Sequence, residues 1–551
     1  MNLSILFEKM PCAGKRLGKS GGFAATVCLA LSAAVLLNAC GGGGGNGGST
    51  GGGGTPPPVG VNGPAWFGFA RDAQHSDLGL TLAQGGVAAQ NLTQIAWETS
   101  IDLAPVTTAA THYGTPMITS KNTVLVPVKT TTAGAFQMEA RQGSNGKLVW
   151  TATSDYLFPT FLPNYNWLPS FGATLTPANR MYMPGAGGKV LYVDNPDGAT
   201  ATTQSLVFYG ANTYAAASAS FDASVYINTP ITSDPNGNIF FGFVVNGSNP
   251  ANLVSGIARI GADGTGSWVA ANTAAGQTVA LNTSMNAAPG LSPDLSTVYM
   301  AVHTVTTGNS VGYLLALDST SLATKGIVQL IDPVSGAPAT VSDLSTASPV
   351  IGPDGDVYFG VLESTLGAHN YRGWLLHFNS TLNVLKTPGS FGWDDTPSIV
   401  PASLVASYKG TSSYLMMSKY NNYAGAGTGD GRNKMAILDP NQTEADPIVG
   451  NPVMNEVMTV LGPTPDTAAL ATYPNAVREW CVNSAAVDPN TNSILMNSED
   501  GFLYRWDLTT GLLSQKIWLD NGYGQAYTPT ALGPDGTVYS INNASLIAVT
   551  Q

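Results

Sequence analysis

The stretch ASPVIGPDGDVYFG, Ala347–Gly360, carries the pattern that decides the fold. A small residue and a proline precede two apolar residues, Pro-Asp-Gly follows, and a β-branched and aromatic run comes next. Turn residues between two such runs predict two strands joined by a tight turn. The pattern recurs along the chain, closely or loosely, at Gly114–Pro127, Gly172–Pro184, Asn228–Gly242, Ala287–Met300, Thr396–Met416, Asn483–Met496 and Tyr527–Gln551.

These eight copies recur roughly every 58 residues, with one longer and one shorter interval. The middle residues of their second strands are Leu125, Tyr182, Phe240, Tyr299, Tyr358, Leu415, Leu495 and Tyr539. Each copy is followed by another apolar strand, a turn and a fourth strand, as in Gly312–Leu330 and Gly501–Leu519. Four short antiparallel strands repeated radially indicate a β-propeller. The sequence therefore predicts an all-β, eight-bladed β-propeller, or a seven-bladed one if Gly172–Pro184 is not a blade.

The last repeat is incomplete. It offers only three strands, at Thr528–Leu532, Thr537–Ile541 and Ser545–Thr550, which would leave an exposed sheet edge. Upstream of the first repeat, Gln94–Ser100 resembles the fourth strand at Lys516–Asn521. We expect this N-terminal strand to complete the last blade, with Ile95 and Trp97 buried.

The N-terminus resembles that of a bacterial lipoprotein. Four basic residues precede the apolar run Phe23–Leu37, which is too short to span a bilayer and ends in LLNACG with Cys40. We expect a signal peptide over 1–39, acylation of Cys40, a Gly- and Pro-rich tether over 40–63 and a propeller over 64–551. By analogy with such lipoproteins, the lack of Asp after Cys40 favours the outer membrane.

Net charge limits the partners. The whole chain carries −12, and removal of residues 1–39 takes away four Lys/Arg and one Glu, leaving 18 basic against 33 acidic residues, or −15. Such acidity argues against binding to nucleic acid. We expect a monomer that meets the membrane only through its lipid, with a small molecule, a glycan or an envelope protein as partner.

The stretch PAWFGFARDAQHSDLG, Pro64–Gly79, is similar to the Trp-x-x-Phe…Asp-x-x-His opening of quinoprotein-like propellers. That superfamily includes the lipoprotein of the outer-membrane barrel-assembly machine. The resemblance covers Pro64–Gln551. Its enzymatic members bind pyrroloquinoline quinone (PQQ) with calcium and use a catalytic Asp, and many have adjacent cysteines at the cofactor. This sequence has no Cys-Cys pair and no C-x-x-C-H haem site.

The resemblance therefore specifies a fold better than a function. We expect a ligand- or protein-binding module, with a PQQ-dependent oxidoreductase as the alternative and a glycan-acting lyase or hydrolase as the third reading. Whether the protein is an enzyme stays open. The cofactor is unknown, since no specific motif supports PQQ with calcium.

The candidate site follows from propeller topology. Links from strand four to the next strand one, and from strand two to strand three, lie on the same face of the ring, here termed the link face. Loops on a rigid scaffold concentrate function. The candidate ligand-binding residues on these links are His112, Tyr113, Trp393, Asp394, Asp395, Arg478, Glu479, Trp480 and Tyr523.

Different side chains in this set offer different contacts. Arg478 offers a fork of donors, Trp393 and Tyr523 offer flat apolar faces, and Glu479 is a potential base. No catalytic residue is assigned. Three histidines, His112, His303 and His369, also fall on the link face, but in different blades, so we expect no metal site.

Two insertions stand apart from the repeats. The aromatic-rich stretch Asp155–Gly172 lies on the link face, either as a loop that plugs the ring or as a stacking platform. Asn451–Gly462 has an N-cap Asn, a Pro at the first helical position and apolar residues at helical spacing. It predicts a short amphipathic helix beside blade six.

Overall fold

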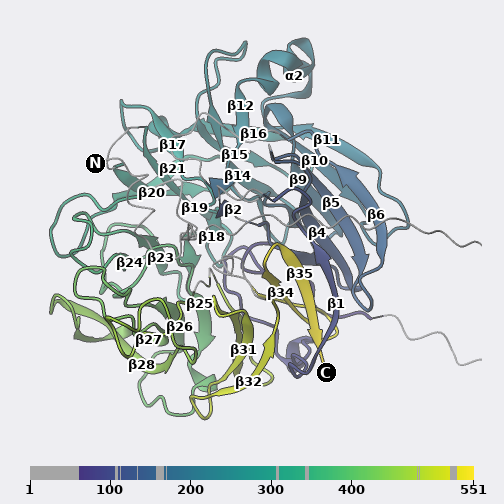
Figure 1. Ribbon diagram of the computed structural model, residues 1–551. Helices are drawn as coiled ribbons and strands as arrows, with labels where there is room; N and C mark the ends of the chain where they lie inside the picture. The colour runs from purple at the N-terminus through teal and green to yellow at the C-terminus, as the bar shows by residue number, and fades with distance from the viewer. Residues whose placement is uncertain are drawn as a thin grey trace, which may run out of the picture. The chain divides into compact units, whose positions relative to one another are not determined.

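A computed structural model describes residues 61–105, 110–111, 113–132, 134–156, 167–168, 171–305, 310–341, 347–480, 482, 484–520 and 530–551. Strands dominate this part of the chain, and its helices are short (Figure 1). The helices are α2 (Ala211–Ala216), α3 (Ser218–Asp222), α4 (Ala271–Ala274), η1 (Leu82–Gln84), η2 (Ala186–Gly188) and η3 (Ala402–Leu404). Among the described residues, none forms a helix long and apolar enough to cross a membrane.

Eight antiparallel sheets form the blades of a propeller, which confirms the predicted fold class. Blades one to four contain β3 (Met117–Ile118), β4 (Thr123–Lys129), β5 (Phe136–Gln142) and β6 (Leu148–Thr153); β8 (Thr174–Leu175), β9 (Arg180–Pro184), β10 (Lys189–Asp194) and β11 (Thr203–Val207); β12 (Val225–Ile227), β13 (Thr232–Ser233), β14 (Ile239–Val245), β15 (Gly256–Ile260) and β16 (Gly266–Ala270); and β17 (Leu281–Thr283), β18 (Gly290–Leu291), β19 (Thr297–Thr304), β20 (Gly312–Asp318) and β21 (Thr324–Gln329).

Blades five to eight continue in chain order. They contain β22 (Val350–Ile351), β23 (Val357–Val361) and β24 (Trp374–Phe378); β25 (Ser398–Pro401), β26 (Tyr414–Tyr420), β27 (Lys434–Ala445) and β28 (Pro452–Leu461); β29 (Ala486–Asp488), β30 (Ser493–Asn497), β31 (Phe502–Asp507) and β32 (Leu513–Trp518); and β33 (Ala531–Leu532), β34 (Val538–Asn542), β35 (Ser545–Thr550) and β1 (Gln94–Ser100). A separate parallel pair joins β2 (Ala110–Thr111) to β7 (Trp167–Leu168).

The repeat anchors all fall in second strands. From Leu125 in β4 to Tyr539 in β34, each of the eight anchor residues is at most 1% exposed. The copy at Gly172–Pro184 supplies β8 and β9 of a four-stranded sheet, so it is a blade and the seven-bladed alternative is wrong.

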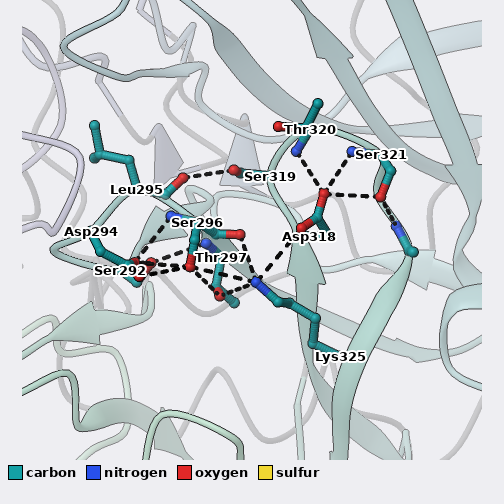
Figure 2. A network of polar contacts seen from close by, with 11 residues as sticks. Ser292, Asp294, Leu295, Ser296, Thr297, Asp318, Ser319, Thr320, Ser321 and Lys325 are labelled. Carbon is teal, nitrogen blue, oxygen red and sulfur yellow. Dashed lines mark hydrogen bonds and ion pairs between the residues drawn. The ribbon is translucent and has the colours of Figure 1, made fainter.

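Figure 2 shows why the turns between strands carry recurring Asp residues. In blade four, the Asp294 carboxylate accepts a hydrogen bond from the backbone N–H of Ser296 at 3.1 Å, and Asp318 accepts from those of Thr320 and Ser321 at 3.1 and 2.9 Å. Lys325 links the two turns, donating to Thr297 Oγ1 at 3.1 Å and lying 3.7 Å from Asp318. Asp caps the turn in this way because its short side chain reaches backbone donors two or three residues on.

The innermost strands share a partner, the crossing segment, Trp66–Gly79. Its backbone forms hydrogen bonds with an inner strand in each of six blades. The bonded residues are Ile118 in blade one, Leu175 in blade two, Leu291 in blade four, Ile351 in blade five, Ile399 in blade six and Val487 in blade seven. Blade three is reached by a side chain, since His75 Nε2 lies 3.5 Å from Thr232 Oγ1. The motif that resembles quinoprotein-like propellers therefore forms a segment whose backbone hydrogen bonds connect the inner strands of several blades.

β1 forms the outer strand of blade eight, antiparallel to β35 and beside it (Figure 1). The Trp97 side chain is 8% exposed and its Nε1–H donates to the Gly143 carbonyl in blade one at 2.7 Å. Burial of Ile95 was predicted as well, and this is wrong, because the side chain is 38% exposed. The register shifts between Ile95 and Trp97, and such a bulge breaks the alternation that would put both on one face.

The helix predicted for Asn451–Gly462 is also wrong. Residues 452–461 form β28, paired with the long strand β27. The register shifts twice along this hairpin, so that neighbours Val453 and Met454 are both buried. Bulges replaced the strict two-residue alternation with a spacing that resembles that of a helix.

A matched pair of substitutions in β1 tests the contribution of this strand to the closed ring. Trp97→Ala should lower the free energy of unfolding by about 3–5 kcal/mol, because it removes a buried ring that bridges blades eight and one. Ile95→Ala, in the same strand but exposed, should change it by less than about 1 kcal/mol. Urea denaturation of both variants measures the difference, and equal losses would show that β1 does not anchor the last blade.

Candidate functional site

Two links of the link face are fastened to each other at blades six and seven. The Asn421 side chain accepts a hydrogen bond from Trp480 N at 3.2 Å and donates one to Trp480 O at 3.0 Å. Asn433 Nδ2 donates to Val477 O at 2.8 Å. The link between β26 and β27 therefore holds residues 477–480 beside the end of β26.

Lys419, the penultimate residue of β26, lies at the centre of this region. Its side chain is 0% exposed, and Nζ makes no hydrogen bond among the described residues. The carboxylate of Asp394 is 3.6 Å away. Taking an ammonium group out of water is unfavourable unless it is paired and hydrogen-bonded, so this position is held at the expense of stability.

Asp395 lies next to this amine and is almost fully buried. Ser418 Oγ donates a hydrogen bond to its Oδ2 at 2.6 Å. Burial raises the pKa of the Asp395 carboxyl to about 7, although the Lys419 charge and the Ser418 hydrogen bond oppose the change. This carboxyl group consequently changes its protonation state near neutral pH.

Two glutamates extend the cluster into blade seven. Burial raises the pKa of Glu479 well above its ordinary value, and the charge of Glu499 adds to the effect. Burial likewise raises the pKa of Glu499 to about 7. The positive charge of Arg478 opposes the rise in the pKa of both glutamates without reversing it. We call Asp394, Asp395, Lys419, Glu479 and Glu499 the Lys419 cluster.

The structure brings part of the predicted site together. Four of the predicted residues lie near Lys419 or near one of its neighbours. The amine is 3.6 Å from Asp394, its charge acts on Asp395 and Glu479, and the charge of Arg478 acts on Glu479. Trp393 is instead buried against Leu362, and Trp480 packs edge-on to Tyr504 at 5.6 Å in the core of blades six and seven. Tyr113 donates a hydrogen bond to Asp102 at 3.1 Å, at the junction of blades eight and one.

Some predicted positions lie outside the described residues. They are His112, Tyr523 and the lipidation residue Cys40, together with most of the aromatic stretch. At the ends of that stretch, Tyr156 and Phe171 are buried, and Phe171 stacks on Phe136 at 4.8 Å. These two aromatic residues pack in the core of the first blades.

Sequence reasoning missed Lys419 and Glu499. Both stand four residues after a repeat anchor, Leu415 and Leu495. Lys129 and His303 occupy the same position in blades one and four. The available signal was an ionisable residue four positions after the anchor, which is near the end of β26 for Lys419 and two residues beyond the end of β30 for Glu499.

A buried set of Ser390, His369 and Asp446 lies between blades five and six. His369 Nε2 is 3.0 Å from Asp446 Oδ2 and 3.4 Å from Ser390 Oγ, and Ser390 also donates to Asp446. The other ring nitrogen, Nδ1, lies 2.9 Å from the Gly373 carbonyl. A hydrolase triad needs the serine and the carboxylate on opposite ring nitrogens, so this set is a structural contact.

Possible metal ligands are spread apart in the described part of the chain. Within the part of the chain that the structure describes, no three His, Cys, Asp or Glu side chains are grouped so that they could hold a metal ion. In the Lys419 cluster, the amine lies 3.6 Å from Asp394, and its charge acts on Asp395 and Glu479.

Comparison with known proteins places the fold. No protein-family profile and no curated protein sequence matches the chain. Among solved structures, it is similar to a europium-containing methanol dehydrogenase, with 10% identity, 86% of this chain and 88% of that chain covered, and a TM-score of 0.51. This similarity confirms the quinoprotein-like β-propeller fold predicted from Pro64–Gly79.

Two further structures are similar at lower scores. BamB from Moraxella catarrhalis has 10% identity, with 83% of this chain and 99% of that chain covered and a TM-score of 0.43. The quinohemoprotein alcohol dehydrogenase from Comamonas testosteroni has 12% identity, with 88% and 77% covered and a TM-score of 0.46.

The raised pKa of Asp395 predicts a pH dependence of stability. Between its ordinary value of 3.8 and about 7, the folded state keeps a proton that the unfolded state has lost, so the free energy of unfolding falls as pH rises. Asp395→Asn removes this titration. From about pH 5 to about pH 8, the variant should lose about 1–3 kcal/mol less than the wild type in urea denaturation.

The control for this experiment is Asp294→Asn. Hydrogen bonds from Ser292 and Ser296 lower the pKa of Asp294, so its contribution is lost only under more acidic conditions. Its pH profile over the same range should follow the wild type. An Asp395→Asn profile parallel to both would show that Asp395 does not titrate near neutrality.

Proposed function

We propose that this protein is a ligand-binding module of the bacterial cell envelope, anchored in the outer membrane through lipid on Cys40, with its binding site at the Lys419 cluster. The observation that supports this most directly is the buried Lys419 amine, which makes no hydrogen bond to any described residue and has only the Asp394 carboxylate, at 3.6 Å, as an ion-pair partner. A buried polar group without a partner is expected where a ligand supplies the partner.

Blade one contains a buried lysine, Lys129, that can be compared with Lys419. Lys129 stands at the same repeat position and is also buried, at 1% exposed. Its amine is 2.6 Å from Asp102 Oδ1 and 2.5 Å from the Ala104 carbonyl. The fold thus satisfies a buried lysine at this position when its role is structural, and Lys419 lacks that arrangement.

The alternative is a PQQ-dependent oxidoreductase. Within the described residues, no three His, Cys, Asp or Glu side chains are grouped to hold a metal ion, but calcium also binds amide and backbone carbonyl oxygens, so a direct binding test is needed. Titration of the purified full-length protein with PQQ and calcium, followed by absorbance, separates the two functions. Saturable binding would favour the oxidoreductase.

Paired lysine substitutions test the proposed site. Lys419→Met should leave the free energy of unfolding unchanged or raise it by about 1–3 kcal/mol, since it removes a poorly compensated buried charge. Lys129→Met should lower it by about 3–5 kcal/mol, because it strands the Asp102 carboxylate. Urea denaturation measures both changes, and mass spectrometry compares any small molecule that co-purifies with each protein.

The folded Lys129→Met protein should retain the co-purifying ligand. The Lys419→Met protein should lose it. If Lys419→Met instead destabilises as much as Lys129→Met, Lys419 is a structural ion pair and the proposed site is wrong.

The anchor is tested by Cys40→Ser. This change removes the thiol that would carry the lipid, and the protein should move from the outer-membrane fraction to the soluble periplasmic fraction. The measurement is fractionation followed by immunoblotting. Unchanged membrane partition of the variant would contradict a lipoprotein.

A further inference from the structure

Arg372, in the link between β23 and β24, is a second buried cation on the link face. Its side chain is 3% exposed, yet Nε and Nη2 have no hydrogen-bond partner among the described residues. Its backbone carbonyl accepts hydrogen bonds from Gly392 N and Trp393 N, both at 3.0 Å. The loop backbone is therefore held by hydrogen bonds, while one edge of the guanidinium has no hydrogen-bond partner in the described part of the chain.

The nearby carboxylate does not occupy this edge. Glu363 is directed at the backbone of the same link, where it accepts from Tyr371 N at 2.8 Å and Gly373 N at 2.9 Å. It consequently shapes the loop that presents Arg372, and no described carboxylate accepts a hydrogen bond from Nε or Nη2 of the guanidinium.

Aromatic stacking compensates the charge only in part. Cζ of Arg372 lies 4.2 Å from the ring centroid of Tyr420 and 6.0 Å from that of Phe391. A stack of this kind uses the face of the guanidinium, whereas its N–H groups point outward in the plane. The stack therefore stabilises the cation but cannot satisfy Nε and Nη2.

The two free donors belong to one edge. Nε–H and Nη2–H of an arginine point the same way and match the oxygens of a carboxylate or phosphate. Arg141 uses this edge within the chain, since its Nε and Nη2 donate to Glu139 Oε2 at 2.9 and 2.5 Å. In Arg372 no described residue supplies such an acceptor to the same edge.

We propose that the Nε–Nη2 edge of Arg372 binds an oxyanion, a carboxylate or phosphate group of the ligand. The inference rests on the proposed function, because it gives the chemical class of that ligand. Lys419 Nζ lies 5.8 Å from the Phe391 ring that Arg372 also approaches, so a second positive charge is close.

The test titrates the full-length protein with sodium acetate and, separately, sodium phosphate, at an ionic strength held constant with sodium chloride. Thermal shift and the NMR line widths of acetate protons and of ³¹P report binding. The wild type should show saturable binding of at least one anion, and the tighter one identifies the group. Arg372→Lys keeps the charge without the fork and should weaken that binding by at least about tenfold.

Arg141→Lys is the matched control and should bind like the wild type, because its edge is already filled by Glu139. Equal affinity of wild type and Arg372→Lys would overturn the inference. So would the absence of saturable binding of both anions by the wild type, in which case water fills the edge.

Lys419→Met separates this inference from the proposed site. Anion binding lost in Arg372→Lys but unchanged in Lys419→Met supports the ligand class and contradicts the Lys419 cluster as its site. Anion binding lost in Lys419→Met but unchanged in Arg372→Lys supports the cluster and overturns the role of Arg372.

Discussion

The hydrogen bonds between the crossing segment and the inner strands are the constraint on which the propeller depends. In a ring of repeats each blade normally contacts only its neighbours. Here one short strip of backbone bonds to the first strands of six blades, and His75 reaches a seventh. The inner ends of the blades are thus fixed relative to a common partner, and so are the links that enter them.

The conformation of the crossing segment reflects this role. Ala70, Arg71, His75 and Asp77 all have positive φ, between 49° and 77°, which is unfavourable for residues other than glycine. Such strain persists only where the surroundings over-determine the backbone. His75 is fully buried, and burial lowers its pKa to about 4, so the ring is neutral at physiological pH and adds no charge to the centre.

The fold could be predicted from the sequence because each repeat has two recognisable features, an apolar second strand and Asp-containing turns. The second strands are buried on both faces and read as apolar runs, and the turns carry Asp residues whose carboxylates cap them, as Asp294 does. The two errors have one cause. Ile95 and the strand Pro452–Leu461 both lie at shifts of strand register, which interrupt the side-chain alternation without a recognisable sequence pattern.

The site could be predicted only in part. Topology indicated that links distant in sequence share a face, and Asp394 and Glu479 do lie around one amine. The amine itself was missed, because the candidates were sought only in the links, whereas Lys419 lies within strand β26, one residue before its end. The aromatic candidates illustrate a general difficulty. Trp393 and Trp480 stand in links, but packing between blades buries both, and a sequence does not state which way a ring turns.

The repeats supply internal references that locate function more sharply than any single residue. Lys129 and Lys419 share a repeat position, and Arg141 and Arg372 share a donor edge. In blade one each cation meets an acid of its own chain. In blades five and six, Nε and Nη2 of Arg372 have no partner among the described residues, and the described carboxylate nearest to an ion pair with Lys419 is that of Asp394, at 3.6 Å. Because blade one satisfies both groups within the chain, the contrast marks blades five and six as the place where we propose an outside acceptor.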